Sequence, residues 1–319
     1  MKRIAIIGSG ISGIGAAYAL KDTADITLFE AQDRLGGHAC THVFDYDGHE
    51  TAVDLGFIVY NGLNYPNLIG LFDALGVKTQ ESDMSFAVSD RDGWEWASTA
   101  RGIFAQKRNL FSIPFHRFWR TILKFNDLAR AELAAGRIED TTLGDWLDFH
   151  GFDQAFRCNY ILPMGAAIWS TPEVGMLDYP ARSFFQFFEN HRLMHKERPQ
   201  WRTVTGGSQS YVKAAAAELG DRVRTGTPAI RVFPFGDKIT VITADNRSHV
   251  FDDVILATHS DQALRLVEKG FEDQSFLLRS VHYRPNTIYL HRDPALMPSR
   301  RAAWASWNVI KQDNGDICL

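Results

Sequence analysis

The chain has 319 residues and a formal net charge of −4, and 45% of its residues are hydrophobic. This composition is ordinary for a folded globular protein of about two domains, and it excludes disordered and low-complexity classes. The charge balance gives no basic footprint for nucleic acid. No run of about 18 apolar residues occurs, so we expect no transmembrane helix. Three widely spaced cysteines form neither a zinc pattern nor a disulfide framework, which favours a reducing cytoplasm and no metal site.

The first thirty residues predict a compact strand, turn, helix and strand. Residues 2–7, which are apolar from Ile4 onward, predict a short buried strand, and glycines follow it at 8, 10 and 13. Small residues at 14–20 predict a helix, and residues 26–30 predict the next strand. A GxGxxG motif between a strand and a helix is typical of a dinucleotide-binding site.

Each glycine of this motif, Gly8-Ser-Gly10-Ile-Ser-Gly13, has a distinct expected role. Gly8 permits the tight turn, Gly10 lets the backbone approach a pyrophosphate, and Gly13 permits close packing of the helix on the strand. The helix N-terminus offers free amides and a partial positive charge to the phosphates. Glu30, at the end of the second strand, is placed to accept hydrogen bonds from a ribose. The cofactor contacts predicted from this unit are Gly8, Gly10, Ser12, Gly13, Glu30 and Ala31.

The character of the chain changes at about residue 85. From there on tryptophan and phenylalanine are dense, and apolar residues recur at helical spacing. We therefore predict an inserted, helix-rich second domain over residues 85–200. The elements predicted up to this point are strands within 39–60 with a turn at 45–48, and helices at 67–75, from Phe118 to Leu133, at 145–150 and at 182–195.

After residue 200 the pattern of alternating strands and helices returns. Glycines at 206 and 207 precede a helix, and an alternating pattern then predicts a hairpin. The elements predicted here are a helix at 208–219, a hairpin of 229–233 and 238–244, a buried strand at 250–258, a helix at 259–267, strands of a second sheet at 287–291 and 302–310, and a last strand at 314–319.

The segment Glu30-Ala-Gln-Asp-Arg34-Leu-Gly36-Gly37-His38 resembles the ExxxRxGG signature of FAD-dependent amine oxidases, protoporphyrinogen oxidases and phytoene desaturases. In that superfamily the glycine pair approaches the FAD diphosphate, and the arginine lies beside the adenosine half. The resemblance implies these roles for Gly36, Gly37 and Arg34. His38, also an implied cofactor contact, stands where amine oxidases commonly have arginine, which favours another branch of the superfamily.

Three later segments resemble the same superfamily in the same order along the chain. Residues 53–58 are similar to the strand beside the isoalloxazine ring, where Gly56 would let the backbone touch the flavin. Residues 228–230 resemble the strand that meets the adenine, and residues 254–258 resemble the strand that ends near the cofactor. The cofactor contacts implied by these segments are Gly56, Phe57, Ile58, Ala229, Ile230, Ala257 and Thr258.

The resemblance extends over nearly the whole chain to a group of bacterial NAD/FAD-binding, flavin-containing amine-oxidase-like proteins. It implies an α/β fold in which a Rossmann-like FAD-binding domain on a parallel sheet carries an inserted helix-rich and mixed-sheet substrate domain. We expect the FAD domain in residues 1–84 and 201–272, and the substrate domain in 85–200 and 273–319. The superfamily has a C-terminal glycine motif that this sequence does not reach, so we expect a C-terminal truncation and an incomplete substrate domain.

The resemblance implies an FAD-dependent oxidoreductase that transfers a hydride from a C–H bond of a small substrate to the flavin. A similar domain is fused to cyclopropane-fatty-acid synthase in plants, which makes a lipid one candidate substrate. Two alternatives stay open, namely an NAD(P)-dependent oxidoreductase without flavin and a non-catalytic FAD-binding partner of a lipid-modifying enzyme. The sequence identifies no catalytic base.

Residues 101–120 interleave basic and aromatic side chains. One interpretation is a peripheral contact with a membrane surface. The other is a helical cap whose aromatic rings enter the core while the arginine heads reach water. We favour the second interpretation.

Overall fold

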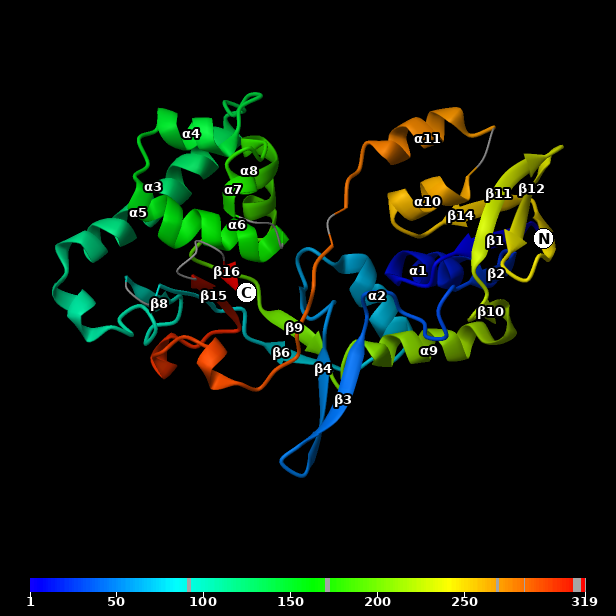
Figure 1. Cartoon of the computed structure of the whole chain (residues 1–319), viewed down its shortest axis with the longest axis horizontal. Coiled ribbons are helices and arrows are strands. Elements are labelled where there is room, and N and C mark those ends of the chain that lie inside the picture. Colours follow the sequence, from blue (N-terminus) through cyan, green and yellow to red (C-terminus); the bar gives the residue numbers. More distant parts are fainter. Residues whose placement is uncertain (91–92, 170–172, 268–269, 284, 312–316, 319) are drawn as a thin grey trace. The chain divides into compact units, whose positions relative to one another are not determined.

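Figure 1 shows a computed structural model of the chain, which describes residues 1–90, 93–169, 173–267, 270–283, 285–311 and 317–318. The fold divides into two compact units, and each unit is assembled from separate stretches of the chain. Unit 1 comprises Met1–Tyr60, Tyr65–Glu81 and Arg202–Tyr289, and unit 2 comprises Asn61–Asn64, Ser82–Trp201 and Leu290–Leu319.

Unit 1 combines a four-stranded, a three-stranded and a two-stranded sheet with flanking helices. Its strands are β1 (Arg3–Ile7), β2 (Asp25–Phe29), β3 (Thr41–Tyr46), β4 (His49–Asp54), β10 (Val223–Arg224), β11 (Ala229–Phe235), β12 (Lys238–Thr243), β13 (Ser248–Phe251) and β14 (Asp253–Leu256). Its helices are α1 (Ile11–Leu20), α2 (Pro66–Ala74), α9 (Gln209–Leu219), a 3-10 turn at Gly220–Arg222, α10 (Ser260–Leu266) and α11 (Glu272–Arg279). Three short strands, β5 (Tyr60–Asn61), β6 (Thr79–Ser82) and β9 (Trp201–Val204), lie where the chain passes between the units.

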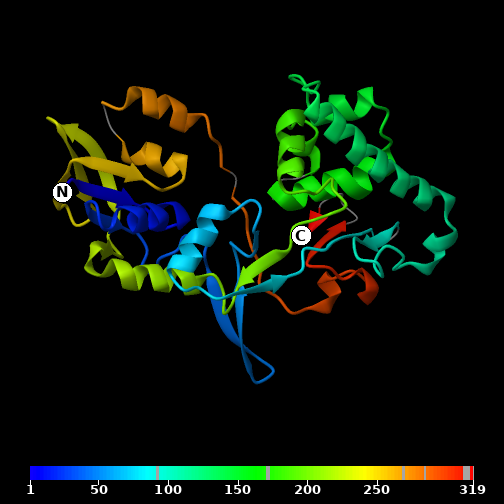
Figure 2. The ribbon, with the colours of Figure 1, turned by 180° about the vertical axis from the view of Figure 1, so that it is seen from behind.

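The centre of unit 1 is a parallel sheet with the strand order β10-β2-β1-β14. Successive side chains of a strand point to opposite faces. Ile4 and Ile6 of β1 therefore pack with α1 and α9, while Ala5 and Ile7 face the antiparallel sheet β11-β12-β13. These layers of unit 1 can be followed in Figure 1 and, from behind, in Figure 2. The predicted α/β fold on a parallel sheet is confirmed.

The prediction of one buried strand over 250–258 is wrong, because two strands of different sheets occupy this segment. β13 ends at Phe251 in the antiparallel sheet, and β14 begins at Asp253 in the parallel sheet. Between them, the Asp252 carboxylate accepts a hydrogen bond of 2.6 Å from the Arg3 amide and pairs with Lys238. These contacts fix the crossing point from one sheet to the other.

The last part of unit 1 also differs from the predictions. Residues 287–291 form no strand, and Tyr289 is 80% exposed, so the alternation seen there packs against no core. α11 was expected to belong to the second domain. It groups with unit 1 because it packs against α10, and the chain leaves unit 1 after Tyr289.

Unit 2 is rich in helices and carries a mixed sheet of strand order β16-β15-β7-β8, in which β15 is parallel to β7. Its strands are β7 (Phe86–Ser89), β8 (Glu95–Ala97), β15 (Trp307–Lys311) and β16 (Ile317–Cys318). Its helices are η1 (Lys107–Phe111), α3 (Ile113–Ala134), α4 (Leu143–Phe149), α5 (Gln154–Phe156), a π-turn at Arg157–Ile161, α6 (Leu162–Trp169), α7 (Glu173–Met176), α8 (Ala181–Asn190) and 3-10 turns at Pro294–Leu296 and Arg301–Ala303.

The core of unit 2 is built largely from aromatic side chains. α3 buries one face, formed by Phe115, Phe118, Ile122, Phe125 and Ala129, as the helical spacing of the sequence predicts. Helix α8 ends at Asn190, earlier than the predicted residue 195, because Arg192 has a left-handed backbone that ends the helix. The strand predicted over 302–310 is shorter than expected, because β15 begins only at Trp307. Most of the strand predicted over 314–319 lies outside the described residues. Within the described part of the chain, no helix has the length and apolar character needed to span a bilayer.

Candidate functional site

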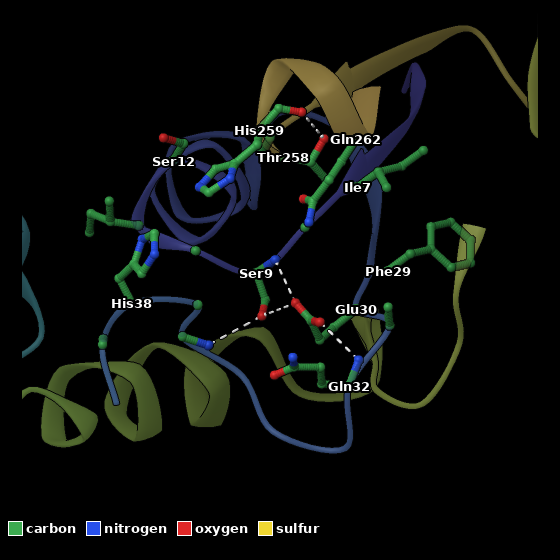
Figure 3. Close-up of a pocket in the computed structure, with 18 of the residues that line it drawn as sticks. Ile7, Ser9, Ser12, Phe29, Glu30, Gln32, His38, Thr258, His259 and Gln262 are labelled. Atoms are coloured by element: carbon green, nitrogen blue, oxygen red, sulfur yellow. Dashed lines mark hydrogen bonds between the residues drawn. The ribbon is translucent and has the colours of Figure 1, made fainter. Parts of the chain in front are cut away.

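A pocket of about 830 Å3 opens in unit 1 at the carboxyl ends of β1, β2 and β14 (Figure 3). Ligands of doubly wound sheets bind at this edge. The predicted residues that line the pocket are Gly8, Gly10, Ser12, Glu30, Ala31, Arg34, Gly36, Gly37, His38, Phe57, Ala229, Ala257 and Thr258. The lining residues that the sequence analysis did not name are Ile7, Ser9, Ile11, Phe29, Gln32, Ala39, Tyr65, Leu68, Tyr211, His259, Gln262, Arg265 and Leu266.

The N-terminus of α1 faces this pocket. The helix begins at Ile11, three residues before the predicted start, and Gly10 is its N-cap residue. No side chain caps it, and its first turn contains no acidic residue. Such a helix end has unpaired amides and a partial positive charge, which suits an anionic group of a ligand.

The three motif glycines are required for different physical reasons. A Cβ on Gly13 would lie 1.8 Å from the carbonyl oxygen of Gly8, and a Cβ on Gly8 would lie 2.7 Å from the carbonyl oxygen of Ala257. Gly8 also has a φ of +100°. A Cβ on Gly10, by contrast, would meet no atom within 4 Å. Gly8 and Gly13 are therefore needed by the fold, whereas Gly10 leaves open space in the pocket.

The Glu30 carboxylate binds the glycine turn to the end of β2. Its Oε2 accepts hydrogen bonds from the Ser9 amide at 3.0 Å and from the Ser9 hydroxyl at 2.5 Å, and its Oε1 accepts one from the Gln32 amide at 2.9 Å (Figure 3). Ser9 is fully buried. Glu30 thus fixes the shape of the turn, a role that the spacing of the motif does not reveal.

The second glycine turn packs directly on the first. The Gly36 amide donates to the Ser9 carbonyl oxygen at 3.1 Å, and Arg34 Nη1 donates to the Gly37 carbonyl oxygen at 3.0 Å. Gly37 has a φ of +56°, and a Cβ there would lie 3.1 Å from the Gly10 Cα. Gly37 is therefore required by backbone packing, independently of any ligand.

Two imidazole rings line the pocket near the start of α1. The ring centroids of His38 and His259 are 5.5 Å apart, and His259 stacks on Tyr283 with centroids 4.4 Å apart (Figure 3 labels both histidines). The Tyr283 hydroxyl accepts a hydrogen bond from the Ser260 amide at 3.1 Å, which holds the start of α10. His259 directly follows Ala257 and Thr258, which the sequence analysis named as cofactor contacts. This position in the sequence could have identified His259 as a pocket residue.

Four predicted cofactor contacts do not line this pocket, namely Gly13, Gly56, Ile58 and Ile230. A Cβ on Gly56 would lie 2.2 Å from the His38 carbonyl oxygen, to which the Phe57 amide donates at 2.9 Å. Gly56 therefore packs against the second glycine turn. Ile58 and Ile230 are 42% and 47% exposed.

Tyr211 of α9 lines the pocket as an uncharged phenol. Burial, assisted by the negative charge of Asp54, raises the pKa of Tyr211 to about 12. The Asp54 carboxylate accepts hydrogen bonds from the Ser208 amide at 2.9 Å and from the Thr41 hydroxyl at 2.6 Å, which anchors the start of α9. Among the described residues, no group of three or more His, Cys, Asp and Glu side chains is arranged to hold a metal ion.

Comparisons with known proteins agree with this geometry. A sequence profile of the family described as flavin containing amine oxidoreductase matches residues 11–292. The chain is 26% identical to a tryptophan 2-monooxygenase of Pseudomonas savastanoi, over 88% of this chain and 56% of that enzyme. It is also 26% identical to a flavin-containing amine oxidase of Oncorhynchus mykiss, over 80% of this chain and 49% of that enzyme.

Among solved structures, cyclohexylamine oxidase from Brevibacterium oxydans IH-35A superposes with a TM-score of 0.65 at 21% identity, over 87% of this chain and 63% of that one. This likeness shows the fold. The chain spans about half to two thirds of the length of these three relatives. Because the family profile covers most of the sequence and the fold agrees with it, the chain belongs to the flavin-containing amine oxidoreductase family.

Proposed function

We propose that the pocket of unit 1 holds the adenosine and diphosphate half of FAD and that the protein is an FAD-dependent oxidoreductase. The observation that carries this proposal is the uncapped N-terminus of α1 beside Gly10, where even a Cβ would meet no neighbour. An open space next to unpaired helix amides fits a pyrophosphate. Membership of a flavin-containing family supplies the identity of the dinucleotide.

The residues of the pocket fit the adenosine half of such a cofactor. Glu30 keeps acceptor capacity beyond its bonds to Ser9 and Gln32, because an ionised carboxylate has about four lone-pair sites, and this capacity suits ribose hydroxyls. The volume of about 830 Å3 lies in the usual range for ligand pockets. Tyr211 stays protonated at physiological pH, so its hydroxyl adds no negative charge that would repel a diphosphate.

When FAD is bound, its flavin ring supplies the redox chemistry, accepting a hydride from a substrate C–H bond. The residues of this chain bind and orient the nucleotide. The amides of α1 hold the phosphates, Glu30 fixes both the ribose and the turn, and Gly10 allows close approach. We assign no catalytic base and propose no residue of unit 2 for that role.

We propose an amine-bearing small molecule as the substrate class. The support is that the relatives carry the names tryptophan 2-monooxygenase and flavin-containing amine oxidase. A lipidic substrate, expected from the plant fusion protein, stays a prediction, as does the cytoplasmic location.

The test is a titration of the purified chain, freed of bound nucleotide, with FAD and separately with NAD+ and NADP+. We expect a flavin spectrum after purification or saturable binding of FAD that is at least about tenfold tighter than that of either nicotinamide dinucleotide. Binding of a nicotinamide dinucleotide without FAD would reject the proposal in favour of the NAD(P)-dependent alternative. Anaerobic mixing of the FAD-bound protein with a panel of amines and lipids follows. Binding of FAD without bleaching by any substrate would favour the non-catalytic partner.

A further inference from the structure

The segment that leads from η1 into α3 carries a surface that the cofactor pocket does not use (teal in Figure 1, before the label α3). Leu110 is 46% exposed, Phe111 89% and Ile113 82%, and we call these three residues the α3 tip. The next two aromatic residues, Phe115 and Phe118, are buried in the core of unit 2. The later rings of this segment enter the core, as expected for a helical cap. The α3 tip does not, so it stays available for the membrane contact that was the other interpretation of residues 101–120.

The backbone of the α3 tip is held in place on both sides. Asn109, which is buried, donates from its Nδ2 to Gln106 Oε1 at 3.1 Å. The Ser112 hydroxyl caps α3 by accepting a hydrogen bond from the Phe115 amide at 3.3 Å. The exposure of the tip is therefore a property of an ordered turn. Large apolar side chains gathered at one exposed point are typical of a surface that meets an apolar partner.

The charged residues around the α3 tip in the sequence are all basic. Between Glu95 and Asp127 the sequence has six Lys and Arg residues and no acidic residue, although the whole chain has a net charge of −4. Arg117, Arg120 and Lys124 follow Ile113 at spacings of four, three and four, so they share one face of α3. That face lies opposite the buried face of the helix. Arg117 forms a loose ion pair of 3.8 Å with Asp153, and both side chains are exposed.

We propose that the α3 tip inserts into the headgroup region of an anionic lipid bilayer and that Arg117 and Arg120 bind lipid phosphates. Along the helix axis these two residues lie about 6 and 10 Å from Ile113, at about 1.5 Å per residue. Interfacial segments penetrate about 5–10 Å, so both guanidinium groups reach the phosphate layer when the tip is inserted. A second copy of this chain fits the surface less well, because two basic faces would repel each other.

Lys124 provides an internal check on this geometry. It lies about 16 Å from Ile113 along the axis, beyond the phosphate layer, and its Nζ lies 5.4 Å from the centroid of the Phe152 ring. The proposal therefore expects the two arginines to contribute more to lipid binding than this lysine.

The experiment is flotation of the chain of 319 residues with vesicles of phosphatidylcholine alone or with about one third phosphatidylglycerol. We expect binding to the anionic vesicles only, and its loss at high salt because the charges are screened. Phe111→Ser/Ile113→Ser should weaken the partition coefficient at least about tenfold. Arg117→Gln/Arg120→Gln should weaken it about 25-fold, since each basic residue near an anionic surface contributes about fivefold.

Three control variants keep the test specific. Phe149→Ser removes an 85% exposed phenylalanine of the same unit, Lys124→Gln removes the distant charge, and Arg137→Gln/Lys196→Gln removes two other exposed charges. We expect the first and third to bind like the unmodified chain. Lys124→Gln should lose less binding than Arg117→Gln alone or Arg120→Gln alone. The measurement needs no flavin, so its outcome is independent of the proposed function.

The proposal is overturned if the unmodified chain does not float with anionic vesicles. It is also overturned if Phe111→Ser/Ile113→Ser and Arg117→Gln/Arg120→Gln bind as well as the controls. Gel filtration over a range of protein concentrations tests the alternative that a second copy of this chain binds this surface. Loss of self-association in Phe111→Ser/Ile113→Ser, without loss of vesicle binding, would assign the α3 tip to an interface between copies of this chain. All substituted side chains are exposed, so we expect unchanged thermal melting throughout.

Discussion

At the motif glycines of unit 1, contact with a single backbone atom decides whether a position accepts a side chain. In the core of unit 2, by contrast, each buried ring contacts several other side chains. A Cβ on Gly13 would meet the Gly8 carbonyl oxygen at 1.8 Å, and this backbone atom cannot move aside as cheaply as the end of a flexible side chain. In unit 2 the Phe125 ring has five aromatic neighbours, with centroids between 5.1 and 6.4 Å away. At the motif glycines of unit 1 a substitution is therefore tolerated or forbidden outright, while in the aromatic core of unit 2 its effect is graded by the volume it removes.

The largest expected effect is that of Gly13→Val. The added side chain cannot coexist with the turn between β1 and α1, so we expect little or no folded protein. Soluble yield and far-UV circular dichroism measure this. Gly15→Ala is the matched control, because a Cβ at Gly15 of the same helix meets no atom within 4 Å. A well-folded Gly13→Val protein would show that the turn can rearrange.

Gly10→Val should give a folded protein that no longer binds FAD. The new Cβ meets no protein atom within 4 Å, and the side chain enters the space proposed for the pyrophosphate. We expect FAD affinity to fall at least about 100-fold, or by about 2.7 kcal/mol, with unchanged thermal melting of the nucleotide-free protein. Purification of Gly10→Val with bound flavin would contradict the placement of the phosphates. Gly37 does not allow this test, since its replacement collides with Gly10.

Phe125→Ala should lower the free energy of unfolding by about 3–5 kcal/mol, the usual cost of removing a fully buried aromatic ring. Urea titration measures it. Because the cavity lies in the core of unit 2, FAD binding by the folded protein should change by less than about twofold. A large loss of FAD affinity would show that the two units do not tolerate substitutions independently.

Glu30→Ala should weaken FAD binding by about 1.5–3 kcal/mol, the range for a hydrogen bond to a charged group. Ser9→Ala is its matched control, because it removes the Ser9 hydroxyl bond to Glu30 and leaves the carboxylate in the pocket. Calorimetric titration of both variants separates the two roles of Glu30. Equal losses would mean that Glu30 acts through the shape of the turn rather than through the ribose.

The smallest expected effect is the pH dependence contributed by His249 of β13. Burial, assisted by the positive charge of Arg224, lowers the pKa of His249, whose ring lies 5.4 Å from that of Phe29. The unfolded chain then binds the proton more readily, so stability is full above about pH 6.5 and falls as the pH drops below it. Urea midpoints at about pH 7.5 and about pH 5.5 should differ less in His249→Gln than in the unmodified chain. An equal difference would exclude this contribution.

The sequence predicted the first glycine turn well, because strand, turn and helix there are adjacent and their spacing is fixed. It did not predict Tyr211, since this residue reaches the pocket only after α9 has packed against the N-terminal strands. It also missed His259, because the resemblance that implied its neighbours Ala257 and Thr258 ends at residue 258. The strand predicted over 250–258 failed for a similar reason, because a hydrophobic run does not show that the chain changes sheets at Asp252. Helical spacing identified the buried face of α3 but gave no sign that Phe111 and Ile113 stay exposed.

The pairing of β1 with β14 also sets an order of events during synthesis on the ribosome. β1 emerges first, and its partner on one side follows about 250 residues later, roughly 12–50 s at about 5–20 residues per second. During that interval one edge of β1 lacks its strand. The aromatic helices of unit 2, from α3 to α8, come from one continuous stretch and can pack before synthesis ends. The nascent chain would therefore complete the helices of unit 2 first. The nucleotide-binding sheet would close late, and so would the sheet of unit 2, whose β7 pairs with β15, so chaperones that shield unpaired strands would act on both units.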